Sequence, residues 1–108
     1  MVNNILTAAG IAHRRGRFTA NPRPSTYAVY MDDVTSSGGD DAGYPRILQH
    51  DVTVELYEAA PDDAAETALE DVITAAGLEW SKQDRYWLQS EQLYQVVYEL
   101  TYFEKRRA

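Results

Sequence analysis

The chain has no cysteine, which excludes disulfide bonds, thiolate metal sites and cysteine nucleophiles. Histidine is scarce, with two residues, and no apolar run approaches the roughly 20 residues that a membrane-spanning helix requires. The first residues lack the basic and long apolar segments of a secretory signal. These features predict a cytoplasmic protein in which residues 1–108 form a single domain with one core.

Acidic and basic residues are unevenly distributed along the chain. The net charge is −7, yet residues 1–25 contain four arginines and no acid. Residues 26–104 contain all 17 acids with only three basic residues, whereas residues 105–107 are all basic. Basic ends on an acidic body favour contacts within one chain or between copies. Nucleic-acid binding is the other interpretation of the arginines, and the acidic body opposes it by long-range repulsion.

Two hydrophobic periods predict the regular elements. Alternation predicts strands over residues 26–32, 50–57, 78–84 and 93–103, with 86–88 continuing the third strand after a turn or bulge. In the clearest of them, Val52, Val54 and Leu56 share the buried face. Between Pro61 and Gly77 the apolar spacing becomes helical and predicts the main helix over residues 62–76, where Asp63 and Glu66 have capping-box spacing.

Two further segments are predicted from composition. Within residues 1–25, a short helix over residues 2–10 is followed by a basic segment whose two prolines favour extended chain. Residues 33–49 are rich in glycine and polar residues, and predict a long hairpin. Its tip is expected to be mobile and consists of Ser37, Gly38, Gly39, Asp40 and Asp41.

The predicted order of elements is helix–strand–strand–helix–strand–strand. Because consecutive strands are joined by hairpins, the sequence predicts a mainly antiparallel four-stranded sheet. The main helix is expected to pack on one face of this sheet. The expected fold class is therefore α+β.

The polar residues show no recognisable catalytic constellation, so we expect no enzyme activity, no metal site and no cofactor. His13 lies among arginines, and His50 and Asp51 point to opposite faces of a strand, so both histidines are expected to be structural. The acidic pair Asp32-Asp33 lacks the spacing of a calcium loop. No serine lies in a nucleophile elbow.

Aromatic residues crowd the last 30 residues of the chain. Tyr94, Tyr98 and Tyr102 share one face of the last strand, which favours the core. Trp87 and its neighbours lie in a polar stretch, where either a core or a partner interface fits. Charge and aromatic content together predict a set of subunit or partner contacts at Arg14, Arg15, Arg17, Arg46, Arg85, Tyr86, Trp87, Arg106 and Arg107.

The order of elements, the glycine-rich hairpin and three segments resemble the small neck and tail proteins of long-tailed phages and prophages. The segments are Tyr-Ala-Val-Tyr at residues 27–30, His-Asp-Val-Thr-Val-Glu-Leu-Tyr at 50–57 and Glu-Gln-Leu-Tyr-Gln-Val-Val-Tyr at 91–98. In layout, most of residues 1–104 resembles the tail terminator (tail completion) group. That resemblance implies a structural virion protein that forms a hexameric ring, caps the tail tube and joins it to the head.

The same resemblance implies the partners and the location. The partners are further copies of the chain, the tail tube and the head or neck connector, without a cofactor or a membrane. DNA at most passes through the lumen, which a negative net charge favours. The protein is expected in the virion, and in the cytoplasm of the bacterial host before assembly.

Three other interpretations of the sequence stay open. The first is another neck component, a head-closure or adaptor protein. The second is a tail-tube subunit. The third is a small cytoplasmic binding or regulatory module that uses its aromatic patch as a ligand groove.

Overall fold

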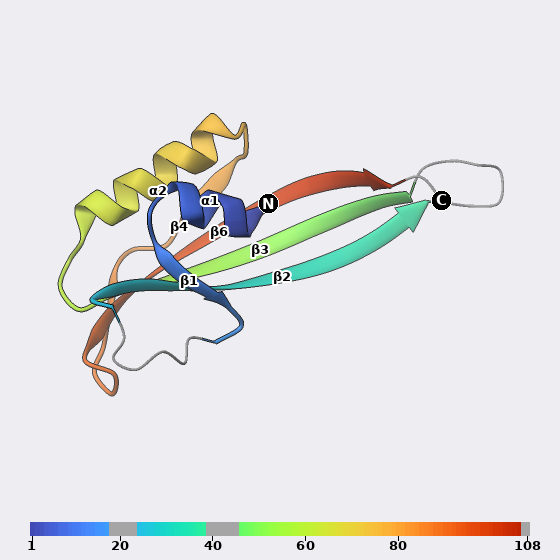
Figure 1. Cartoon of the computed structure of the whole chain (residues 1–108). Helices are drawn as coiled ribbons and strands as arrows, with labels where there is room; N and C mark the ends of the chain where they lie inside the picture. Colours follow the sequence, from blue (N-terminus) through green and yellow to red (C-terminus); the bar gives the residue numbers. More distant parts are fainter. Residues whose placement is uncertain (18–23, 39–45, 107–108) are drawn as a thin grey trace.

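The computed structural model describes residues 1–17, 24–38 and 46–106, and shows an elongated molecule of 53 × 27 × 21 Å. Two helices accompany one sheet of six strands (Figure 1). The elements, in chain order, are α1 (Val2–Ala8), β1 (Ala12–Arg15), β2 (Thr26–Gly38), β3 (Arg46–Glu58), α2 (Asp63–Ala75), β4 (Trp80–Lys82), β5 (Tyr86–Leu88) and β6 (Leu93–Arg106).

Strand β3 lies at the centre of the sheet and pairs along its whole length on both sides. It is antiparallel to β2, from Thr26 opposite Glu58 to Gly38 opposite Arg46. It is also antiparallel to β6, from Arg46 opposite Arg106 to Glu58 opposite Tyr94. Its side chains alternate between buried and half-buried positions, because one face of the sheet packs on the helices and the other does not.

The predicted four-stranded, mainly antiparallel sheet with one main helix is wrong. The sheet has six strands in a mixed arrangement, because β1 pairs in parallel with β2. The short strands β4 and β5 both pair with the outer edge of β6. The predicted strand over residues 78–84, with its continuation at 86–88, is in fact the two separate strands β4 and β5. Sequence periodicity missed β1 because its four residues are too few to show a period.

Both helices cover the same face of the sheet, and the core lies between the two layers (Figure 1). Leu6 of α1 and Leu69 and Ile73 of α2 are fully buried there. They pack against sheet residues that are also buried, among them Val54 and Leu56 of β3. Burial of these apolar side chains is the main stabilising contribution in this layer.

Helix α2 begins at a different cap from the one that its sequence suggests. Asp62, not Asp63, is the N-cap residue, and its carboxylate accepts a hydrogen bond from the backbone N–H of Ala65 at 3.1 Å. Thr26 of β2 also donates to this carboxylate, at 2.6 Å. Asp62 therefore ties the start of α2 to the sheet, and Glu66 is left for the ion pairs described below.

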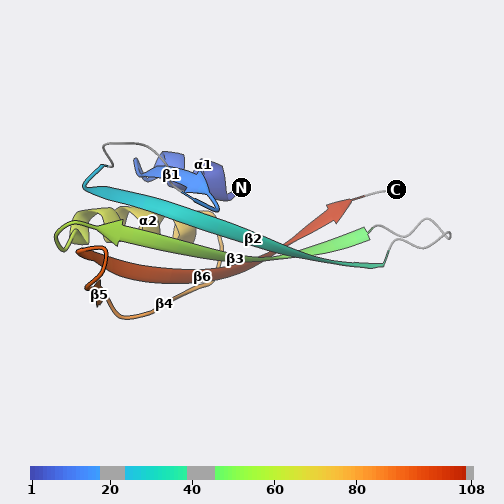
Figure 2. The ribbon, with the colours of Figure 1, turned by 90° about the horizontal axis from the view of Figure 1, so that it is seen from below.

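Beyond the helices the three long strands continue as an arm, shown in side view in Figure 2. We define the arm as residues 33–38 of β2, 46–51 of β3 and 101–106 of β6, which lie directly opposite one another. The rest of the sheet, with its two helices, is called the base. Ser37 and Gly38, predicted at a hairpin tip, belong to β2 in this arm. The other predicted tip residues, Gly39, Asp40 and Asp41, lie outside the described residues.

We expect Asp62→Ala to lower the free energy of unfolding by about 0.5–2 kcal/mol, the usual contribution of an N-cap side chain. Urea denaturation followed by circular dichroism measures this loss. Asp71→Ala is the matched control, since Asp71 is an exposed acid in the same helix. Equal effects of the two substitutions would contradict the capping role of Asp62.

Candidate functional site

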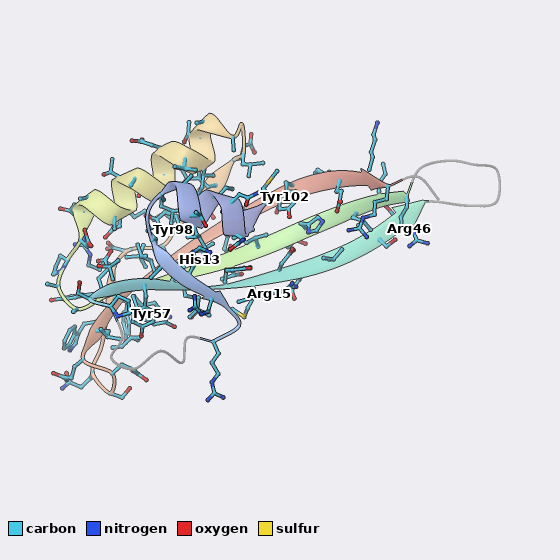
Figure 3. All side chains as sticks on the ribbon, viewed as in Figure 1. His13, Arg15, Arg46, Tyr57, Tyr98 and Tyr102 are labelled. Carbon is cyan, nitrogen blue, oxygen red and sulfur yellow. The ribbon has the colours of Figure 1, made fainter. Side chains whose placement is uncertain are left out.

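The predicted contact residues lie in three separate places, two of which are opposite edges of the sheet. Strand β1 forms one edge, and β4 and β5 lie at the other edge, beyond β6. Arg46 and Arg106 lie opposite each other at the end of the arm, far from Arg15 at the first edge (Figure 3). Arg107 lies outside the described residues.

The edge formed by β1 is basic. Arg14 and Arg15 are exposed residues of β1, and Arg17 follows it after a turn at Gly16. The turn is fixed because the N–H of Gly16 donates to the carbonyl of Tyr30, 2.9 Å away. Among the described residues, no carboxylate forms an ion pair with Arg15 or Arg17. Their charges are therefore directed to solvent or to a partner.

His13 holds this basic edge against the first helix. Its ring nitrogens lie 2.8 Å from the carbonyl oxygen of Ile11 and 2.6 Å from the side-chain oxygen of Asn3. The ring also packs at an angle to Tyr30 of β2. The contacts of His13 therefore have a structural role: they join α1, β1 and β2.

The opposite edge exposes two aromatic side chains of β5. Tyr86 is 66% exposed and Trp87 is 37% exposed. The Trp87 ring packs against Tyr94 at 4.8 Å between centroids, and its N–H donates to Gln89. Partly exposed and rigidly held aromatic rings are typical of protein interfaces.

Arg85, between these strands, is partly exposed and is directed toward the start of α2 and the end of β3. Its guanidinium lies 3.3 Å from Glu58 and 2.6 Å from both Asp63 and Glu66. Lys82 makes a second pair with Glu66 at 2.8 Å. These contacts fasten the β4–β5 segment to helix α2 and to the end of β3.

Burial and the neighbouring charges together set the protonation of the two central carboxyl groups in this cluster, Glu58 and Glu66. Burial and the nearby Glu66 carboxylate raise the pKa of Glu58. Burial alone would raise the pKa of Glu66 too, but its contacts with Glu58, Lys82 and Arg85 outweigh burial and lower it. Glu66 therefore carries the negative charge that Lys82 and Arg85 neutralise.

The ion-pair cluster leaves the β4–β5 edge acidic on its outer side. Lys82 is also bound by Glu70 at 2.8 Å, so both basic residues of this edge are paired with carboxylates of the same chain. The neighbouring exposed charges, Glu79, Asp84 and Glu91, are all acids. The sheet thus has a basic edge at β1 and an acidic, aromatic edge at β4 and β5.

Tyr98 lies in the core, as the alternation along β6 predicts, and it connects the core to this ion-pair cluster. Its ring is fully buried, and its hydroxyl donates to Glu70 at 2.6 Å. Burial and the Glu70 carboxylate raise the pKa of Tyr98, so the hydroxyl stays protonated as a donor. Trp80 packs edge-on against the same ring.

A second polar cluster crosses the three strands where the arm begins. His50 of β3 lies 2.9 Å from Asp32 of β2 and 3.0 Å from Glu104 of β6, and its ring stacks on Tyr102 at 4.4 Å. Burial would lower the pKa of His50, but the two carboxylates outweigh it and raise the pKa. The hydrogen bond from His50 lowers the pKa of Glu104. This cluster links all three strands of the arm.

The sheet face that the helices leave uncovered is acidic along its middle. Asp33, Asp51, Glu55 and Glu99 lie on this face. The hydrogen-bond donors to Asp51 and Glu55 are neutral side chains of glutamine, threonine and tyrosine residues. Carboxylates without basic partners give this face a negative potential.

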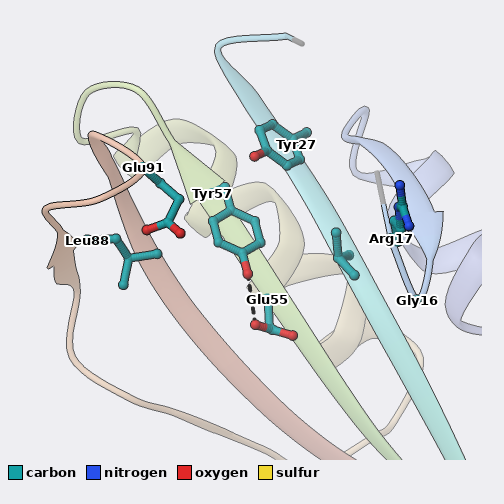
Figure 4. Close-up of a pocket in the computed structure, with 8 residues that line it drawn as sticks. Gly16, Arg17, Tyr27, Glu55, Tyr57, Leu88 and Glu91 are labelled. Atoms are coloured by element: carbon teal, nitrogen blue, oxygen red, sulfur yellow. Dashed lines mark hydrogen bonds between the residues drawn. The ribbon is translucent and has the colours of Figure 1, made fainter. Parts of the chain in front are cut away.

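At the base of this face lies a shallow groove of about 270 Å³ (Figure 4). Tyr27 and Tyr57 stack within it at 5.2 Å between ring centroids. The Tyr57 hydroxyl donates to Glu55 at 2.8 Å, and burial together with this carboxylate raises the pKa of Tyr57 to about 12. The hydroxyl is therefore protonated at neutral pH and acts as a hydrogen-bond donor. Arg17 and Glu91 complete opposite walls.

In the part of the chain that the structure describes, no helix is long and apolar enough to cross a membrane. The same residues hold no group of three or more histidine and acidic side chains arranged to bind a metal ion.

Comparison with known proteins identifies a fold but no family. No protein-family model matches the chain, and no curated protein sequence matches it. A chain in the solved structure of the virion of a native gene transfer agent (GTA) particle superposes with a TM-score of 0.56 and 16% sequence identity. The match covers 96% of this chain and 84% of that chain. The protein therefore shares its fold with a component of a virion particle.

We expect Tyr98→Phe to lower the free energy of unfolding by about 1.5–3 kcal/mol, because the substitution removes a buried hydrogen bond to a carboxylate. Urea denaturation measures the loss. Tyr102→Phe is the control, since the Tyr102 hydroxyl has no hydrogen-bond partner among the described residues, and its ring stacking is kept. A Tyr98→Phe protein as stable as the control would show that the bond to Glu70 contributes little.

We expect His50 to titrate above its ordinary pKa of 6.5, because two carboxylates stabilise its charged form. A raised pKa contributes stability that is present below the ordinary pKa and is lost as pH rises through the folded pKa. NMR titration of the imidazole measures the pKa, and thermal unfolding against pH measures the loss. His50→Gln should remove this part of the pH dependence. A His50 pKa at or below the ordinary value would refute the expectation.

Proposed function

We propose that the protein is a structural component of a phage-type virion and acts as a tail terminator. In this role a ring of subunits caps the tail tube and joins it to the head. The observation that carries the proposal is the fold shared, over 96% of the chain, with a component of a gene transfer agent virion. The resemblance of the chain to tail terminator proteins supports the same role.

The two edges of the sheet support assembly into a ring. A basic edge at β1 and an acidic, aromatic edge at β4 and β5 are complementary surfaces on opposite sides of one subunit. Contacts between unlike surfaces are head-to-tail and close into rings when the rotation between subunits allows it. Opposite charges also guide such subunits into register.

The arm supports a contact with a second virion protein. It extends beyond the helix layer and carries Arg46, Lys105 and Arg106 at its end (Figure 3). A projecting element can reach a tail tube or a connector without disturbing the edges that join neighbouring subunits. In this proposal the β1 and β4–β5 edges hold the ring together, and the end of the arm engages what lies above or below it.

Molecular mass in solution, measured by native mass spectrometry over a range of concentration and salt, tests the ring. We expect a hexamer, or a monomer that becomes a hexamer as the concentration rises. Because complementary charges contribute to the contact, Arg15→Glu/Arg17→Glu should shift the equilibrium toward monomer. Adding Glu79→Lys/Glu91→Lys to that variant should restore the assembly, since the charges of both edges are then exchanged.

Asp71→Lys serves as the control for a change of charge away from both edges and should leave the mass unchanged. If the Arg15→Glu/Arg17→Glu protein assembles to the same mass as the unchanged protein, the β1 edge is not a contact between subunits. A protein that stays monomeric at every concentration would contradict assembly of the free chain. That outcome would favour an adaptor or head-closure protein that assembles only on its partner.

A further inference from the structure

The arm has two long backbone edges that no described residue covers. Pairing of β1 with β2 ends at Tyr30, so residues 31–38 of β2 have an open edge. Pairing of β4 with β6 ends at Leu100, so residues 101–106 of β6 have an open edge on the other side. An unpaired strand edge exposes a row of backbone N–H and C=O groups that another strand can bind.

Part of each edge lacks the charge and proline that usually prevent strand addition. Residues 34–37 of β2 are Val-Thr-Ser-Ser, and residues 101–103 of β6 are Thr-Tyr-Phe, with no proline and no charge in either run. The exposed large apolar residues of the arm lie on these two strands, with Val34 49% exposed and Phe103 67% exposed. Edges that stay free are usually protected by charge, proline or a bulge, and these two runs contain neither charge nor proline.

The charges of the two open edges favour pairing of a β2 edge with a β6 edge over pairing of two edges of the same kind. The open edge of β2 contains two acids, Asp32 and Asp33, and no base. The open edge of β6 contains Lys105 and Arg106 with one acid, Glu104. Asp32 and Glu104 are already paired with His50, and Arg106 with Glu104, so Asp33 on the β2 edge and Lys105 on the β6 edge are the charges without a described ion pair. These opposite charges favour a β2 edge beside a β6 edge over two β2 edges side by side.

We infer that the arms of neighbouring copies pair edge to edge, with the β6 edge of one copy adding to the β2 edge of the next. This inference rests on the proposed ring and names a second contact within it. The polarity agrees with the contact at the base of the sheet. The basic β1 edge and the β2 arm edge lie on one side of the subunit, and the β4–β5 edge and the β6 arm edge lie on the other.

The geometry also sets the direction of the new pairing. Strands β2 and β6 both run toward the end of the arm, since each is antiparallel to β3. In a ring whose arms all point the same way, the added pair is parallel. The base is wider than the arm by β1 on one side and by β4 and β5 on the other. Because each strand occupies about 4.8 Å, paired arms must lean toward the axis of the ring.

The absence of cysteine from the chain allows a direct test by cross-linking. One cysteine replaces Met31 or Thr35 on β2, and a second replaces Thr101 or Phe103 on β6. The four combinations cover four neighbouring registers, from Thr35 level with Thr101 to the register in which Asp33 faces Lys105. All four positions lie on the face that the helices leave uncovered. Within one copy, β3 lies between β2 and β6, so the two cysteines are at least about 9.6 Å apart. This distance exceeds the roughly 7 Å limit between the Cα atoms of a disulfide, so a cross-link must join two copies.

We expect at least one double-cysteine variant to form, on mild oxidation, a ladder of cross-linked species that ends at the mass of the ring. A reducing agent should collapse the ladder to monomer. Each single-cysteine variant should remain uncross-linked alone, and a mixture of one β2 variant with one β6 variant should stop at dimers.

Two results would overturn the inference: cross-linking of a single-cysteine variant with itself, which indicates pairing of like edges, or no cross-link in any of the four combinations. The mass of the unoxidised protein separates the two proposals. A ring mass without cross-links would refute the paired arms and leave the tail terminator proposal standing. A monomer without cross-links would refute both the paired arms and assembly of the free chain.

Discussion

The rest of the structure depends on the pairing of β3 with β2 and β6 along its whole length. Hydrogen bonds on both sides hold β3 within the sheet, and the alternation of its side chains then assigns each residue to one face. At the base this places Val54 and Leu56 under the helices. Because the same three strands are longer than the helix layer, they continue outward as the arm.

Buried charge then decides which surfaces are left for contact. Glu58 lies at the end of β3, and Glu66 is a buried residue of α2. Burial of a carboxylate without a cation would be costly, so Arg85 pairs with both and Lys82 pairs with Glu66. This removes the two cations from the β4–β5 edge and leaves its outer side acidic. The polarity of the subunit, basic at one edge and acidic at the other, is therefore a consequence of how the core neutralises its own carboxylates.

The base and the arm differ in what stabilises them. The base combines a helix layer, a buried apolar core and an ion-pair network. The arm lacks a helix layer and is held by its backbone pairing and by side-chain contacts between its strands, chief among them the cluster in which His50 joins Asp32 to Glu104. A three-stranded ribbon without a covering layer buries little apolar surface, so further strands from a second copy would extend the pairing that already holds it.

Local patterns in the sequence determined a strand with Val52, Val54 and Leu56 on its buried face and a helix between Pro61 and Gly77, because periods of 2 and 3.6 residues depend only on neighbouring positions. Only the tertiary structure decided the number and direction of the strands, since the parallel partner of β2 is too short to show a period. It also directed Arg85 toward α2 and β3 and brought His50 to Asp32 and Glu104, residues 18 and 54 positions away. Contacts between residues so distant in sequence depend on how the strands pair, and no local spacing encodes them.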